Sequence, residues 1–145
     1  MKKQKSYLFK NMLLKKGDES TQAVFSSRGE LEVGPAPEFE GSPETLNPEE
    51  MFIAAINNCL MTTCFYFVRK LNVHISLYHS EAKGYVEKQA DAFRFTNVQA
   101  RGKVTSRQPD IADRVPELAN LAEKYSLVSR SVACPVQYSS VVQVK

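Results

Sequence analysis

The segment 47–71 constrains the fold more than any other part of the sequence. Its only proline is Pro48, at a position where a helix can begin, and it contains no glycine, so nothing interrupts a helix. Asn47 can accept hydrogen bonds from free backbone N–H groups, and Glu49 and Glu50 complement the positive end of a helix dipole. The sequence therefore predicts a long helix over 47–71.

The apolar side chains of this predicted helix point in nearly all directions around its axis. They do not form the single stripe of a surface helix, so we expect the helix to be buried on almost every side. They are Met51, Phe52, Ile53, Ala54, Ala55, Ile56, Cys59, Leu60, Met61, Cys64, Phe65, Phe67, Val68 and Leu71. Few other elements can cover such a helix, so either a sheet wraps around it or a second copy of the chain does. We favour a homodimer.

The rest of the chain predicts strands on both sides of this helix and a second helix near the end. Two long strands are expected at 73–87 and 92–106, followed by a helix that opens at Asp110. Pro116 predicts a kink or a later start in that helix. The shorter expected elements are strands at 7–14, 21–26 and 31–33, turns at 15–20, 28–29 and 88–91, an extended loop at 34–46, an irregular segment at 126–135 and a closing strand at 137–144. This order indicates an α+β fold in a single domain over 1–145.

Composition argues against several classes of partner. The chain has 145 residues, of which 43% are hydrophobic, and no apolar run approaches the roughly 20 residues that a membrane span needs. The net charge is +3, and six lysines in the first sixteen residues could attract an anionic partner. No basic stretch interleaved with aromatic residues supports nucleic-acid binding. We therefore expect a soluble cytoplasmic protein that binds neither nucleic acid nor membrane.

Three cysteines carry the candidate chemistry. They are too few for a secreted disulfide scaffold, and with only two histidines in the chain they do not make a metal site. Cys59 follows Asn57 and Asn58, which are costly on a wholly buried surface, so this turn is expected to face a cleft or an interface. Cys134 lies in a loop-like segment, where it is either exposed and reactive or packed. Cys64 is expected in the core, although Cys59 could equally be a core cysteine.

Two motifs resemble the family of osmotically induced proteins and organic hydroperoxide reductases, the OsmC/Ohr family. The stretch from Asn47 to Cys59 resembles the family's helix signature, in which a cysteine follows the first glutamate by ten positions. The stretch Ala133-Cys134-Pro135-Val136 resembles the motif of its second cysteine. The resemblance implies an OsmC-like fold, with antiparallel sheets packed around a long buried helix, in an intertwined homodimer.

The resemblance also implies a thiol peroxidase that needs no bound cofactor and no metal. Cys59 would attack an organic hydroperoxide and become a sulfenic acid, and Cys134 would resolve it to a disulfide. A dithiol reductant of the lipoyl type would then restore both thiols. Glu49 is about 15 Å along the helix from Cys59, so it would have to serve the thiol of the other subunit.

One departure from the family pattern concerns an arginine that stabilises the thiolate. At one placement of that arginine this sequence has Glu38, whose carboxylate would raise the pKa of a neighbouring thiol. Arg28 is the only arginine upstream of the helix and could substitute for it, or could be a solvated turn residue. The alternative function is therefore an OsmC-like protein without peroxidase activity, which binds an apolar ligand or partner in the cleft between subunits.

Overall fold

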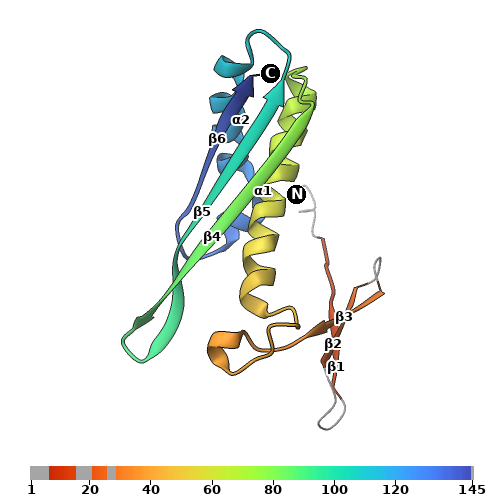
Figure 1. Ribbon diagram of the computed structural model, residues 1–145, viewed down its shortest axis with the longest axis vertical. Helices are drawn as coiled ribbons and strands as arrows, with labels where there is room; N and C mark the ends of the chain where they lie inside the picture. The colour runs from red at the N-terminus through yellow and green to blue at the C-terminus, as the bar shows by residue number, and fades with distance from the viewer. Residues whose placement is uncertain (1–6, 16–20, 26–28, 145) are drawn as a thin grey trace, which may run out of the picture. The chain divides into compact units, whose positions relative to one another are not determined.

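A computed structural model describes residues 7–15, 21–25 and 29–144 of the chain (Figure 1). The chain divides into two compact units, residues 1–51 and residues 52–145. Each unit contains one three-stranded sheet, and the long helix begins at the end of the first unit. The predicted α+β class is confirmed.

The sheet of the first unit has the antiparallel order β1-β2-β3. Its strands are β1 (Met12–Leu14), β2 (Thr21–Phe25) and β3 (Gly29–Val33). The strand predicted at 7–14 is wrong in length, because Met12 already pairs with Val24, one residue before β2 ends. By the same register only Asn11 has a further β2 residue, Phe25, opposite it, and the residues before Asn11 have none. The turns predicted at 15–20 and 28–29 lie mostly outside the described residues.

The loop predicted at 34–46 contains one short turn of 3-10 helix, η1 (Pro37–Phe39). Glu40 follows it in the left-handed region, with φ 64°. Gly41 is required next, because a Cβ there would lie 1.7 Å from the carbonyl oxygen of Pro35. The backbone N–H of Gly34 donates to the carbonyl of Leu46 at 3.1 Å, which ties the two ends of the loop together.

The helix α1 (Pro48–Lys70) begins and ends within a residue of the prediction. Asn47 caps it as expected, since its Oδ1 accepts a hydrogen bond from the N–H of Glu50 at 2.8 Å. Within this chain only one stripe of α1 is buried, formed by Ile56, Leu60, Cys64 and Val68. By length and apolar composition alone α1 could cross a membrane, a test that the core helices of soluble proteins also pass.

The second unit places three strands side by side (Figure 1). β4 (Leu77–Gln89) and β5 (Ala92–Ser106) form a long antiparallel hairpin, and β6 (Val136–Val144) runs parallel to β5 on its other side. The connection from β5 to β6 contains α2 (Ile111–Tyr125) and α3 (Leu127–Ser131).

Three sequence predictions in this unit need correction. β4 begins at Leu77 and not at residue 73, because the chain first turns past the end of α1. α2 runs from Ile111 through Pro116, so a later start is wrong. The segment 126–135 is not wholly irregular, because α3 forms within it, capped by Ser126.

The core lies between α1, α2 and the sheet of the second unit. Phe52 stacks against Phe95 with ring centroids 4.6 Å apart, and Phe65 meets the edge of Tyr78 at 5.5 Å. Cys64 is buried, which confirms its predicted place in the core. These contacts fix the rotation of α1 on the sheet, and therefore the direction in which the other side chains of α1 point.

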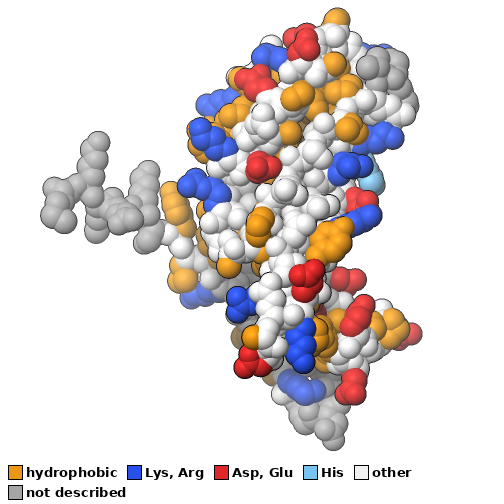
Figure 2. Space-filling model, turned by 90° about the vertical axis from the view of Figure 1, so that its left-hand side faces the viewer, with side chains coloured by type: hydrophobic (Ala, Val, Ile, Leu, Met, Phe, Trp, Pro, Cys, Tyr) orange, Lys and Arg blue, Asp and Glu red, His pale blue; other side chains and the backbone are white. Residues whose placement is uncertain are grey.

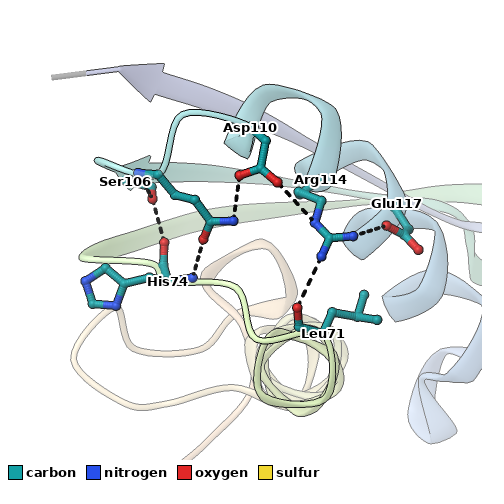
Figure 3. A network of polar contacts seen from close by, with 7 residues as sticks. Leu71, His74, Ser106, Asp110, Arg114 and Glu117 are labelled. Carbon is teal, nitrogen blue, oxygen red and sulfur yellow. Dashed lines mark hydrogen bonds and ion pairs between the residues drawn. The ribbon is translucent and has the colours of Figure 1, made fainter.

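A polar network ties the end of α1 to the start of α2 (Figure 3). Arg114 donates to the carbonyl of Leu71 at 3.2 Å and forms ion pairs with Asp110 at 3.7 Å and Glu117 at 3.5 Å. Gln108 extends the network by accepting from the N–H of His74 at 2.9 Å and donating to Asp110 at 2.7 Å. The network satisfies a carbonyl that the end of α1 would otherwise leave without a partner.

Candidate functional site

Cys59 lies in the middle of α1 and is only partly buried. It therefore differs from Cys64, which the core covers. Asn58 beside it is exposed, while Oδ1 of Asn57 is buried and has no hydrogen-bond partner among the described residues. An unpartnered buried acceptor is costly, which is consistent with the expectation that this turn of α1 faces a cleft or an interface; that expectation stays a prediction.

The thiol of Cys59 faces the start of α3. The backbone N–H of Val128 donates a hydrogen bond to Sγ of Cys59 at 3.5 Å, and the side chain of Ser126 also hydrogen-bonds the thiol. These residues are 67 and 69 positions away in the sequence, so the arrangement depends on how the second unit folds. No sequence prediction included Ser126 or Val128 in the site.

These donors set the protonation of Cys59. Partial burial raises the pKa of the Cys59 thiol, because burial disfavours the charged form. Hydrogen bonds from the Ser126 side chain, the Val128 backbone, the Thr63 side chain and the Leu127 backbone lower it, and together they outweigh the burial. The pKa of Cys59 therefore lies below the ordinary value of a thiol. A larger fraction of Cys59 is therefore thiolate at neutral pH than of an ordinary cysteine, and the thiolate is the nucleophilic form.

The other two cysteines are also free thiols, in different surroundings. Burial raises the pKa of Cys64, and a hydrogen bond with Tyr138 only partly offsets this, so Cys64 is the less reactive thiol. Cys134 is partly buried against the core and stands just before β6. Cys134 lies six residues beyond Val128 in the sequence, and the N–H of Val128 contacts the Cys59 thiol.

The two other predicted site residues are Glu49 and Arg28, and the structure describes only Glu49. Glu49 occupies the first turn of α1, and its Oε2 is buried without a hydrogen-bond partner among the described residues. A carboxylate oxygen left in that state is expected to meet a donor from elsewhere. Arg28 lies outside the described residues.

An open groove runs beside the Cys59 turn of α1. Its volume is about 560 Å³, and its lining comes from α1 and the end of α2: Thr62, Thr63, Tyr66, Phe67 and Tyr125. Thr63 links the groove to the Cys59 turn, since it lines the groove and its hydroxyl donates to the carbonyl of Cys59 at 2.7 Å. Among the described residues no group of three or more His, Cys, Asp or Glu side chains could hold a metal ion.

Comparison with known proteins agrees with this architecture. The fold is similar to that of an OsmC-like protein of unknown function from Vibrio cholerae, with a TM-score of 0.83 at 18% identity over 94% of this chain and 100% of that one. It is also similar to an organic hydroperoxide resistance protein from Legionella pneumophila (TM-score 0.73, 14% identity, 96% of this chain and 100% of that one). The OhrB protein of Bacillus subtilis gives a TM-score of 0.65 at 16% identity, over 94% of this chain and 100% of that one.

These identities are low, so the likeness establishes the fold and not the activity. No curated protein matches the sequence significantly. The family model of OsmC-like proteins matches residues 41–140, which include the helix signature after Asn47, both motif cysteines and the whole of the second sheet hairpin. The chain therefore belongs to the family of OsmC-like proteins.

Proposed function

We propose that this protein is a thiol-dependent peroxidase that reduces organic hydroperoxides, with Cys59 as the attacking thiol. The observation that carries the proposal is the set of hydrogen-bond donors around Sγ of Cys59, which lowers the pKa of that thiol. Two proteins of the same fold, from Legionella pneumophila and Bacillus subtilis, are named for resistance to organic hydroperoxides. A nucleophilic thiolate beside an apolar groove suits such a substrate better than hydrogen peroxide.

The proposed reaction proceeds in two steps at Cys59 and one at an external dithiol. The Cys59 thiolate attacks the terminal oxygen of the hydroperoxide, the S–O bond forms as the O–O bond breaks, and the departing alkoxide takes a proton to become an alcohol. The Cys134 thiolate then attacks the sulfenic acid sulfur, the S–S bond forms as the S–O bond breaks, and the departing hydroxide takes a proton from solvent to become water. A lipoyl-type dithiol reduces this disulfide and is itself oxidised to a cyclic disulfide.

The short tether between the two cysteines supports Cys134 as the resolving thiol. Six residues separate it from Val128, whose N–H contacts Sγ of Cys59. A chain of six residues spans at most about 20 Å, which keeps Cys134 within that reach of the residue that contacts the Cys59 thiol. The carbonyl of Pro135 accepts from the N–H of Val98 at 3.0 Å, so Cys134 itself has to move away from its contacts for the disulfide to form.

Glu49 is proposed to act from the partner subunit, and its Oε2 has no hydrogen-bond partner among the described residues. Arg28 is proposed to substitute for the family's arginine from a different loop.

We propose that the working form is a homodimer of one OsmC-like domain, 1–145, in the cytoplasm. Exposed apolar side chains support the dimer: Leu8 and Phe9 are 79% and 87% exposed in the first unit, and Tyr66 is 48% exposed on α1. Figure 2 shows hydrophobic side chains reaching the surface among Lys and Arg side chains. Such apolar surface is covered in most stable proteins. Analytical ultracentrifugation tests the dimer, and a monomer at micromolar concentration contradicts it.

Counting thiols after exposure to peroxide tests the reaction. One equivalent of cumene hydroperoxide is expected to reduce the number of titratable thiols in the denatured protein from three to one, leaving Cys64. Cys59→Ser should abolish this loss, whereas Cys64→Ala, at a position outside the reaction, should preserve the loss of two thiols. A count that stays at three in the wild-type protein ends the peroxidase proposal.

A second candidate function is binding of an apolar ligand without peroxide chemistry. The groove of Tyr66, Phe67 and Tyr125 favours it, as does Glu38 in place of the family's arginine. This function requires a Cys59 thiol of ordinary or raised pKa. Iodoacetamide labelling at increasing pH distinguishes the two, since a thiol that reacts well below pH 7 supports the peroxidase and counts against a ligand carrier.

A further inference from the structure

Ser126 stands at the junction of two helices, and every hydrogen-bonding group it has is engaged. Its N–H donates to the carbonyl of Ala122 at 2.9 Å at the end of α2, and its carbonyl accepts from the N–H of Arg130 at 3.1 Å in α3. Its Oγ lies 3.5 Å from the donating N–H of Ser129 and 2.8 Å from the hydroxyl of Ser129. The residue is 0% exposed. Its position is therefore fixed by two helices at once.

The side chain of this fixed residue reaches the Cys59 thiol. Ser126 hydrogen-bonds Sγ of Cys59, and the N–H of Val128 reaches the same sulfur at 3.5 Å. Oγ of Ser126 accepts from the Ser129 N–H, and when the Ser129 hydroxyl is the donor in the contact between the two hydroxyls, the Ser126 proton is donated to the sulfur. A thiolate can only accept, so this orientation suits the ionised form of Cys59 and not the neutral thiol.

We propose that Ser126 is a catalytic residue of this protein, whose hydroxyl, together with the N–H of Val128, holds the thiolate of Cys59 for attack. The inference rests on the proposed peroxidase function. In the family pattern an arginine stabilises the thiolate, and here neutral hydrogen-bond donors would stabilise it instead. The donors are already in place before substrate arrives, so no reorganisation is needed when charge is present on the sulfur.

The balance of effects on the pKa of Cys59 is consistent with this assignment. Partial burial raises the pKa of Cys59, and of the groups that lower it, the Ser126 side chain has the largest effect, ahead of the Val128 backbone, Thr63 and Leu127. All of these are uncharged hydrogen-bond donors. Ser126 is therefore the single side chain whose removal should most reduce the thiolate fraction.

The experiment measures the pH dependence of Cys59 alkylation by iodoacetamide in the full-length protein, with the labelled cysteine identified by mass spectrometry. Ser126→Ala is expected to move the midpoint of the rate profile to higher pH by about one unit. At pH 6 to 7, where the rate follows the thiolate fraction, this shift is a loss of roughly tenfold in rate. Ser131→Ala is the matched control, since that serine is on the same short helix and its hydroxyl donates to the carbonyl of Leu127 at 2.8 Å.

Two further variants separate the proposed role from a purely structural one. Ser126 also caps α3, so alanine could disturb that helix, whereas Ser126→Gly removes the hydroxyl at a cap cost of only a few tenths of a kcal/mol. Ser126→Asp keeps a good cap but places a carboxylate beside the sulfur. Because a carboxylate beside the sulfur raises the pKa of the thiol by its charge alone, the aspartate variant tests whether the side chain of residue 126 lies at the thiol. The glycine variant tests the hydroxyl: if Ser126 only caps α3, its midpoint should match wild type, and if the hydroxyl holds the thiolate, its midpoint should rise as in the alanine variant.

The outcomes also distinguish this inference from the peroxidase proposal. Alkylation needs no hydroperoxide, so a raised midpoint in the glycine variant supports the role of Ser126 even where peroxide turnover is absent. A midpoint within 0.2 units of wild type in either the glycine or the aspartate variant, as expected for Ser131→Ala, would overturn it. Circular dichroism and the melting temperature of each variant confirm that the folded protein is being compared.

Discussion

Gly102 offers the sharpest test of how the core beneath α1 is packed. It lies on β5 between Ser80 of β4 and Ser140 of β6, and it is buried. A Cβ at this position would lie 2.8 Å from the hydroxyl of Tyr138, 2.9 Å from Oγ of Ser140 and 3.2 Å from a ring carbon of Tyr78. The absence of a side chain at 102 leaves the space in which the two tyrosine hydroxyls meet, 2.8 Å apart.

The cost of Gly102→Ala follows from these contacts. A methyl group forced into a packed core costs about 1–3 kcal/mol. Separating the two hydroxyls removes a hydrogen bond worth about 0.5–1.5 kcal/mol. We therefore expect the free energy of unfolding to fall by roughly 2–4 kcal/mol, which for a protein of this size lowers the melting temperature by about 5–15 °C.

Urea unfolding at one fixed protein concentration measures this loss, since dimerisation would otherwise change the apparent stability. A double-mutant cycle with Tyr138→Phe supplies the control, because phenylalanine removes one of the atoms that the new methyl group meets. The double variant should be more stable than the sum of the single effects predicts, by about 1 kcal/mol or more. Effects that add to within about 0.5 kcal/mol would refute the reasoning.

Three further predictions follow from described contacts. Arg114→Met should lower the free energy of unfolding by about 1 kcal/mol in urea titrations, because its ion pairs are partly exposed and worth little while the carbonyl of Leu71 loses a donor. A thiol reagent at pH 8 should label two cysteines of the native protein quickly and Cys64 only on unfolding, because burial raises the pKa of Cys64 and covers it. Burial also raises the pKa of Tyr78 and Tyr138, so the unfolded chain loses these protons at a lower pH than the folded protein does. Stability should therefore fall as the pH rises above about 10, which thermal melts at increasing pH measure.

The sequence specified α1 well because its signals are local. Asn47, Pro48 and the two glutamates after them act within one turn of helix, and the structure confirms the cap of Asn47 on Glu50. The apolar pattern also placed Cys64 in the core correctly. The pattern could not say which stripe faces this chain's own sheet, because a helix that is apolar all round offers several equivalent faces.

The donors to Cys59 could not be predicted from the sequence, because they are not close to Cys59 along the chain. Ser126 and Val128 approach the thiol from almost seventy residues away, and only the packing of α2 and α3 brings them there. One local signal was available, because Ser126 directly follows a helical pattern and serine is a preferred residue at a helix N-cap. It predicts the existence of α3, though not its contact with the thiol.

The parallel pairing of β6 with β5 has a consequence for how the second unit assembles. β4 and β5 meet across a turn of two residues, Ala90 and Asp91, so their hairpin can form early. β6 can join only after about thirty intervening residues have folded, which is a slower, non-local event. The contact between Tyr78 and Tyr138 therefore forms only when β6 joins the sheet, late in folding. Because the protein contains no tryptophan, the ultraviolet absorbance of tyrosine can be used to measure the rate of that step.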